Sequence, residues 1–366
     1  MKFKPSFDWL FVFVPIAIAL RFWPGGASPT ALFICSALGI IPAAGWIGHA
    51  TEALAARVGT GLGGLLNATF GNAAELIIAG LALSRGLTNV VKASITGSII
   101  GNVLLVLGLS IVAGGTKYSE QRFNRAGART SIVSLSLAAI ALIIPAVFHF
   151  AASATPTGWN PATAQKLSLA IALVLLLTYA CLLGFSLRTH KHFFHSCGSE
   201  LEEPEQNWSR RRAITILVAA TAVVALLSEF LVGTIENLRA SFGITDVFVG
   251  VIVVAIVGNA AEHSTAVVMA MKNKMDLSVG IAIGSSLQIA LLVAPVLVFL
   301  SYLLGRPMDL EFSLPEIFAV VASVYILFQI TGDGETNWIE GVQLLSVYLI
   351  LAILFFYLPA PRVLAP

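Results

Sequence analysis

The sequence consists of long apolar stretches separated by short polar segments, and this pattern predicts a bundle of membrane-spanning helices. Many of the stretches exceed the roughly 18 apolar residues that cross the hydrocarbon of a bilayer. Eleven such helices are predicted, over residues 8–23, 30–52, 62–84, 93–113, 128–150, 165–187, 213–234, 245–271, 277–304, 314–331 and 338–359. The predicted fold class is therefore an all-α integral membrane protein with about eleven transmembrane helices.

The first apolar stretch has a second interpretation, which is a cleaved secretory signal peptide. Lys2 and Lys4 precede it, and the small residues 25–28 follow it, as they do in such leaders. However, Phe22-Trp23-Pro24 is a poor neighbourhood for cleavage. We therefore favour a retained first helix.

Composition supports a membrane protein and excludes several other classes. Of the 366 residues only 11% are charged and 57% are hydrophobic, whereas soluble proteins carry about 25% charged residues. A net charge of +2 leaves no basic surface for a nucleic acid. There is no GxxxxGKS/T loop for ATP, and no cofactor is predicted. The cysteines lack zinc-site or disulfide-framework spacing and are expected to pack in the membrane: Cys35, Cys181 and Cys197.

The distribution of Lys and Arg predicts which helix ends face the cytoplasm. With a cytoplasmic N-terminus, the segments predicted to lie inside hold 14 of the 21 Lys and Arg residues, as the excess of these residues on cytoplasmic loops requires. The C-terminus then lies outside, which requires an odd number of helices. Since the sequence shows no targeting extension, a bacterial inner membrane is the expected location.

The longest polar stretch, residues 188–212, divides the chain in two. It contains three histidines, then four glutamates between Glu200 and Glu205, then the basic run Arg210–Arg212. It is interpreted either as a solvated linker with a stop-transfer charge cluster or as an acidic collar that gathers cations near an entrance.

An internal repeat relates the two halves. Gly71-Asn72-Ala73-Ala74-Glu75 recurs identically as Gly258-Asn259-Ala260-Ala261-Glu262, at an offset of 187 residues. The same offset relates 97–98 to 284–285 and 104–106 to 291–293. The two GNAAE segments lie five spans apart and so run in opposite directions. The repeats are therefore inverted, and transporters of this kind bind their substrate near the membrane midplane, where the repeats meet.

The inverted repeat predicts the organisation of the chain. An extra N-terminal helix occupies residues 1–29, the first five-helix repeat 30–187, the linker 188–212 and the second five-helix repeat 213–366.

Glu75 and Glu262 are predicted to lie in the middle of their spans. A charge in the hydrocarbon costs on the order of several kcal/mol, so each must face protein or a watery cavity. Asn72 shares a helix face with Glu75, and Asn259 repeats this arrangement. Gly71 and Gly258 allow either close helix approach or a local break that exposes backbone carbonyls.

These residue types predict a site for a hard cation. Carboxylate and amide oxygens with two negative charges suit Ca²⁺, which takes 6–8 oxygens, better than Mg²⁺, which keeps several waters. No thiolates or paired imidazoles favour a softer metal. The following helices add Ser98, Asn102, Ser285 and Gln288, which act as ligands or as polar contacts between helices.

Paired carboxylates also predict ion coupling. Two charges close together in a low dielectric cannot both persist without a counter-charge. Either one divalent cation or protons can neutralise them, and this competition is the basis of antiport.

Four other titratable residues have two interpretations each. His263, next to Glu262, suits a proton relay or gate, or helix packing. Glu52, Glu229 and Glu236 suit an ion pathway, or interfacial exposure.

At these residues the sequence resembles the calcium/proton exchanger family of the calcium:cation antiporter superfamily. The resemblance rests on Gly71–Glu75, Gly258–His263, Gly97–Asn102, Gly284–Gln288, Ala50–Glu52 and Asn337–Gly341. It implies export or compartmental loading of calcium driven by protons, with Glu75 and Glu262 as the essential acids beside Asn72 and Asn259. It also implies an acidic helix between the halves, no autoinhibitory N-terminal extension and, as in related exchangers, homo-oligomers.

Three other functions compete with calcium/proton exchange. A sodium/calcium exchanger shares the inverted architecture, and a calcium channel would conduct without a proton gradient. An intramembrane metalloenzyme would need a motif such as HExxH, which this sequence lacks.

Overall fold

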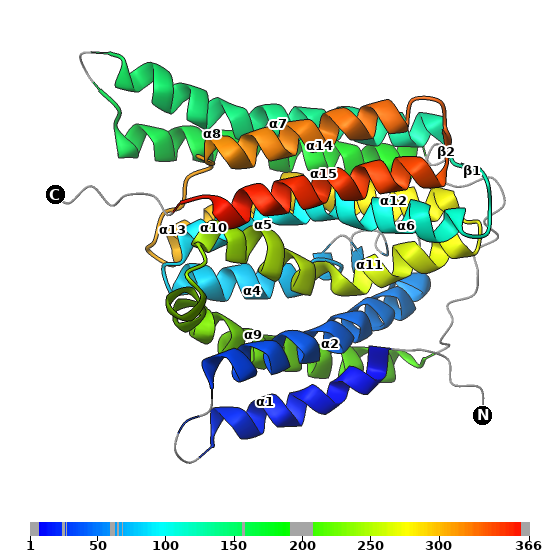
Figure 1. The fold of residues 1–366 in the computed structure, drawn as a ribbon, viewed down its shortest axis with the longest axis horizontal. Coiled ribbons are helices and arrows are strands. Elements are labelled where there is room, and N and C mark those ends of the chain that lie inside the picture. Colours follow the sequence, from blue (N-terminus) through cyan, green and yellow to red (C-terminus); the bar gives the residue numbers. More distant parts are fainter. Residues whose placement is uncertain are drawn as a thin grey trace.

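The computed structural model describes residues 7–359 apart from 24–25, 27, 59–62, 64–65, 68, 156–157 and 191–207. Almost all of the described residues belong to helices that run along one bundle (Figure 1). A short 3₁₀ segment, η1 (Phe7–Val12), leads into α1 (Phe13–Arg21), which packs on the outside of α2. The segment at the N-terminus is therefore a helix of the bundle.

The helices of the first repeat follow α1 in sequence. They are α2 (Pro29–Val58), α4 (Ala73–Ser84), α5 (Thr88–Ile100), the π-helical turn η2 (Gly101–Val106), α6 (Leu107–Gly115), α7 (Arg125–Ser153), α8 (Pro161–Gly184) and the π-helical turn η3 (Phe185–Thr189). Since η2 joins α5 to α6 without a break, residues 88–115 form one crossing.

The second repeat contains the corresponding helices. They are α9 (Arg210–Phe242), α10 (Asp246–Phe248), the π-helical turn η5 (Val249–Val254), α11 (Ala255–Met271), α12 (Met275–Gln288), the π-helical turn η6 (Ile289–Val293), α13 (Ala294–Leu303), α14 (Leu314–Ile330) and α15 (Trp338–Tyr357). Two short strands, β1 (Gln121–Arg122) and β2 (Glu335–Thr336), pair antiparallel and join the repeats.

The predicted fold class is confirmed. Eight helices among the described residues are long and apolar enough to cross a membrane, and α4 and α14 are shorter apolar helices. With α1 they make eleven crossings. The first described helix starts at one end of the bundle and the last described helix ends at the other (Figure 1), as an odd number of crossings requires. The residue boundaries of the repeats and linker stay a prediction.

Two predicted spans differ from the structure. The predicted span 62–84 is not one continuous helix, because residues 71–72 form a turn and α4 starts at Ala73. The predicted span 213–234 is too short. Helix α9 continues to Phe242, since apolar Ile235 and Leu238 remain buried, and it ends where Gly243 adopts a left-handed backbone (φ +64°).

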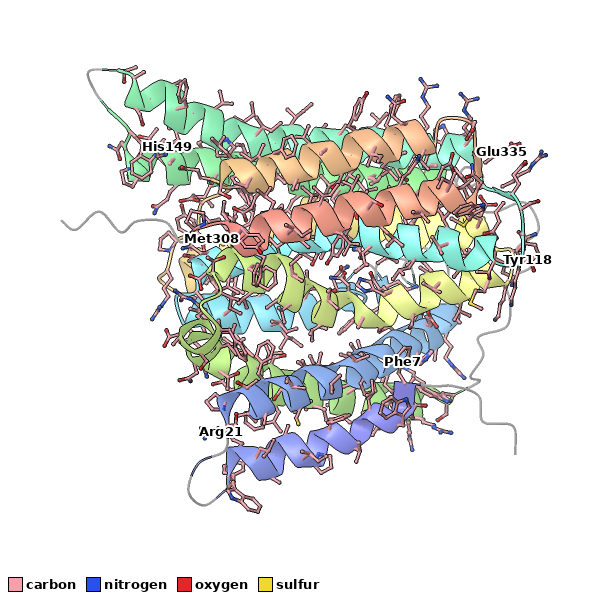
Figure 2. All side chains as sticks on the ribbon, viewed as in Figure 1. Phe7, Arg21, Tyr118, His149, Met308 and Glu335 are labelled. Atoms are coloured by element: carbon pink, nitrogen blue, oxygen red, sulfur yellow. The ribbon has the colours of Figure 1, made fainter. Side chains whose placement is uncertain are left out.

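The helix bundle has two ends, which face opposite sides of the membrane. Figure 2 shows one end with Phe7, Tyr118 and Glu335, here called the Phe7 end, and the other with Arg21, His149 and Met308, here called the Met308 end. At the Met308 end the Lys92 Nζ lies 2.9 Å from Asp309 Oδ1, which ties α5 to the loop before α14.

The central helices lie between two outer groups. Helices α2 and α9 pack together on one side with α1, and α7, α8 and α14 lie on the other (Figure 1). Helices α4, α5, α11 and α12 occupy the middle, and the crossing Thr88–Gly115 has the largest buried share, 83%. This placement brings both GNAAE segments to the interior.

Candidate cation site

Glu75 is placed by a helix that begins inside the bundle. Asn72 is the N-cap residue of α4 (φ −100°, ψ 22°), and Glu75 is the third helical residue, 9% exposed. A side chain at Gly71 would lie 2.6 Å from the Asn67 carbonyl oxygen, so only glycine fits this turn. The free N–H groups at a helix start favour a carboxylate there. The first GNAAE segment is therefore interrupted at residues 71–72, and the exposure of backbone carbonyls there stays a prediction.

Glu262 is placed differently, on an unbroken helix. Gly258 and Asn259 lie within α11, after the π-helical turn η5. Gly258 supplies close approach: a Cβ there would lie 3.2 Å from Glu75 Cγ and 3.7 Å from its Oε1. The Glu75 side chain thus rests against Gly258 of the second repeat, one helical turn before Glu262 on α11.

A chain of hydrogen bonds joins the two repeats beside the acids. The Asn259 amide donates to Ser98 Oγ at 2.9 Å, and Asn102 Nδ2 donates to Asn259 Oδ1 at 3.3 Å and to Ser285 Oγ at 2.9 Å. Ser285 in turn lies near the Glu262 carboxylate. The chain therefore ends beside one of the two acids.

Asn72 and Gln288 form a separate pair. Asn72 Nδ2 donates to Gln288 Oε1. Two buried oxygens in the site have no hydrogen-bond partner among the described residues, namely Asn72 Oδ1 and Glu262 Oε2. Buried polar atoms are usually paired, and these two lie at the acid pair, where they are available to a bound ion. The structure therefore brings together all ten predicted site residues around Glu75 and Glu262, through hydrogen bonds, charge or the close contacts of the two glycines.

A small cavity lies beside Glu75. Its volume is about 10 Å³, which is space for about one water molecule. Its polar lining comes from Glu75, Ser94 and Ser98, and the remainder is apolar: Ile78, Ala79, Ile95, Val254, Ile289, Val293 and Leu297. Ser94 is not among the site residues predicted from the sequence. A hydroxyl one turn before Ser98 on an apolar helix is the signal that points to it.

The two ends of the bundle differ in how tightly they close over the site. At the Met308 end a Cβ on Gly97 would lie 2.2 Å from the Val251 carbonyl oxygen, and a Cβ on Gly250 would lie 2.4 Å from Ala93 Cβ. Helices α5 and η5 are therefore in backbone contact there, and glycine is required at both positions.

The corresponding face of α12 is open at the Phe7 end. Leu277 is 39% exposed whereas its repeat partner Val90 is 1% exposed, and Gly280 is exposed whereas Ala93 is fully buried. Glu262 is itself half-buried. Helix α12 is therefore less covered near its start than α5 is at the matching residues.

The remaining predicted residues lie elsewhere. Glu229 pairs with Arg85, which caps the end of α4, and Gly233 leaves room for that guanidinium. Glu52 is exposed, 3.9 Å from His49 Nδ1, and Glu236 is exposed on α9. His263 is half-buried next to Glu262. None of these predicted residues is among the described residues that line the cavity.

The buried Glu316 and the predicted acidic collar are two further acidic features of the chain. Glu316 is 5% exposed, yet it accepts from the Ser313 N–H at 2.9 Å and from its hydroxyl at 2.6 Å, so it caps α14. The proposed acidic collar, Glu200–Glu205, lies outside the described residues, and its role stays a prediction.

Comparison with known proteins finds relatives along almost the whole chain. A family profile described as "Sodium/calcium exchanger protein" matches residues 28–188 and 212–357. The "Ca(2+)/H(+) antiporter" of Synechocystis sp. is 44% identical over 365 residues, 96% of each chain. The "Ca(2+)/H(+) antiporter ChaA" of Bacillus subtilis is 46% identical over 350 residues, 94% of this chain and 97% of that one. The solved structure of native YfkE has a TM-score of 0.81 at 44% identity, covering 96% of this chain and 99% of that chain.

Proposed function

Because the chain belongs to the sodium/calcium exchanger protein family, we propose that it exchanges Ca²⁺ for protons across a membrane as a secondary active antiporter. Relatives at 44–46% identity along nearly the full chain carry that activity in their names. The observation that carries the proposal is the pair of acids, Glu75 and Glu262, which two inverted repeats bring together beside unpaired buried oxygens. The chain acts as a transporter rather than an enzyme and needs no cofactor, since calcium is its substrate.

The chemistry of the site supports this exchange. Ca²⁺ takes carboxylate and amide oxygens in flexible sets, and here the site offers two carboxylates and one free amide oxygen. One Ca²⁺ balances both negative charges. When it leaves, two carboxylates of like charge remain in a low dielectric, and protons neutralise them. The two ions therefore occupy one site in turn.

Alternating access follows from the inverted repeat. The contact of Gly250 with Ala93 closes the Met308 end. The 187-residue offset relates these residues to Gly63 and Gly280 at the Phe7 end, where Gly280 is exposed. We assign the opposite state of the carrier to closure over α12 at the Phe7 end, with α5 and η5 separated. Only one end closes at a time, so the site opens to one side in each state.

The placement in the membrane rests on charge. The excess of Lys and Arg at the Phe7 end supports a cytoplasmic N-terminus, so this structure opens towards the cytoplasm. A bacterial inner membrane is supported by the bacterial relatives. The interval between the two matched parts of the chain, 189–211, supports the predicted linker 188–212. Homo-oligomer formation stays a prediction of the family resemblance.

Transport by purified protein in liposomes tests the function. An imposed pH gradient should drive uptake of radioactive Ca²⁺, and a sodium gradient of equal size should not. The variants Glu75→Gln and Glu262→Gln serve as controls for leak. Uptake that requires sodium and ignores the pH gradient would establish the sodium/calcium alternative, and uptake without any gradient would indicate a channel.

A further inference from the structure

Two asparagines that are equivalent in sequence are used differently in the structure. Asn72 and Asn259 occupy the same place in the two GNAAE segments, and both are buried, at 0% and 1% exposure. The sequence alone predicts the same role for both residues, but their hydrogen bonds in the structure are different.

The Asn259 side chain is fully engaged within the protein. Its amide donates to Ser98 Oγ and to the Ala255 carbonyl oxygen, both at 2.9 Å, and its Oδ1 accepts from Asn102 Nδ2 at 3.3 Å. A primary amide has two N–H donors and a carbonyl oxygen with two lone pairs, so both donors and one of the two lone pairs of Asn259 are in use. This residue connects α11 to α5 and η2.

The Asn72 side chain leaves its oxygen free. Its amide donates to Gln288 Oε1, and its Oδ1 is buried without a hydrogen-bond partner among the described residues. An amide that directs its NH₂ group at an acceptor must direct its oxygen the opposite way. Leaving a buried oxygen unpaired is unfavourable unless a ligand completes it.

A one-residue displacement explains the difference. The 187-residue offset maps Gln288 onto Gly101 and Asn102 onto Ile289. Asn259 therefore has no glutamine at the matching place. It meets Asn102 instead, which presents N–H donors and occupies the asparagine oxygen. Gln288 presents an acceptor and leaves the oxygen of Asn72 open.

We propose that Asn72 Oδ1 is a direct ligand of the transported Ca²⁺ together with Glu75 and Glu262, that Gln288 is the positioning residue that orients it, and that Asn259 holds the repeats together without binding the ion. This inference rests on the proposed function and deepens it. The two halves of the site then supply one carboxylate each but only one of them supplies an amide oxygen.

The test measures the free Ca²⁺ concentration for half-maximal, proton-driven uptake in liposomes. Asn72→Ala and Gln288→Leu should each raise it about tenfold or more. Asn259→Ala should lower the thermal unfolding temperature in detergent and the maximal rate, with half-saturation within about threefold. Ser286→Ala, which loses a hydroxyl bonded only to backbone carbonyls, is the control for packing in α12.

A double variant separates positioning from general packing. Aspartate presents an oxygen in either orientation of its side chain, so in an Asn72→Asp background the Gln288→Leu change should no longer affect half-saturation. The coupling between two contacting residues is what such a cycle measures. A packing role for Gln288 predicts the same loss in both backgrounds. If Gln288→Leu folds poorly, Gln288→Met, which keeps the side-chain length but lacks the amide oxygen, takes its place in both backgrounds.

The outcomes distinguish this inference from the proposed function. If wild-type protein shows no proton-driven uptake, the function itself is refuted. Two results would refute only the unequal roles of the asparagines, provided that the wild-type protein transports. One is that Asn259→Ala raises the Ca²⁺ concentration for half-saturation as much as Asn72→Ala does. The other is that Gln288→Leu leaves this concentration unchanged in the wild-type background, or raises it equally in the wild-type and Asn72→Asp backgrounds.

Discussion

The close contact of α5 with η5 yields a sharp prediction for Gly97→Ala. A methyl group at this position would lie 2.2 Å from the Val251 carbonyl oxygen and 2.5 Å from its Cα. Packed carbon–oxygen contacts are about 3.3–3.6 Å long, so the two backbones must separate by about 1 Å. Overpacking of this kind costs about 1–3 kcal/mol, which corresponds to roughly a 5- to 150-fold shift away from the state closed at the Met308 end.

The inverted repeat provides the matched control for this change. Gly284 is the repeat partner of Gly97, and its Cβ would have no atom of the described residues within 4 Å. Gly284→Ala should therefore be neutral or slightly stabilising, because alanine is favoured over glycine in a helix by about 0.5–1 kcal/mol.

The assay reports which end is open. A cysteine in place of Ser94, in a chain whose natural cysteines are replaced by serine, lines the cavity beside Glu75. An impermeant maleimide added at the Met308 end should label it faster in Gly97→Ala protein than in the parent, and Gly284→Ala should not change the rate. Equal labelling in both glycine variants, with equal unfolding temperatures, would refute the idea that this contact closes the Met308 end.

Four further predictions follow from the site and the fold. Glu75→Gln and Glu262→Gln should each reduce exchange in liposomes to background while the protein stays monodisperse in detergent, because one carboxylate cannot balance Ca²⁺; appreciable exchange by either variant would contradict a shared site. Lowering the pH on the side where Ca²⁺ binds should raise the Ca²⁺ concentration for half-saturation, since protons and Ca²⁺ compete for the same two carboxylates, and a pH-independent value would exclude competition. Glu229→Gln should keep the exchange rate within about twofold of wild type and change the free energy of unfolding by less than about 1 kcal/mol, because the ion pair of Glu229 with Arg85 is partly exposed. Loss of exchange would show that Glu229 belongs to the ion pathway. A reporter fused after Pro366 should be active on the non-cytoplasmic side, and cytoplasmic activity would contradict the orientation assigned from charge.

Much of the fold could be predicted because it depends on local composition. The length of an apolar run determines whether a helix spans a bilayer, and polar residues at helix starts provide their own caps, as Asn160 and Ser209 do. The identity of the key acids was also predictable, since Glu75 and Glu262 are carboxylates within apolar spans and lie in a repeated motif. Burial cost alone places such residues in the interior.

Pairings between distant segments could not be predicted in the same way. Glu229 was a candidate for the ion path, but Arg85 reaches it from a position 144 residues away in sequence. Ser94 joins the cavity only because α4, α5, η5 and η6 converge there. The sequence shows that these residues are polar within apolar helices, and their neighbours depend on how the helices pack.

The two GNAAE segments show most clearly where sequence ends and tertiary structure begins. By itself the sequence determined that both would be buried, that they run in opposite directions and that each brings one acid to the centre. The same five letters nevertheless begin a helix at residues 71–75 and continue one at 258–262. Only the tertiary structure decided this, because the matching asparagines have different partners in the two repeats. In the first segment the Gly71 N–H ends the preceding helical turn on the Asn67 carbonyl oxygen at 2.8 Å and the Asn72 side-chain amide donates to Gln288, whereas in the second Asn102 and Ser98 hold Asn259 within a continuous helix.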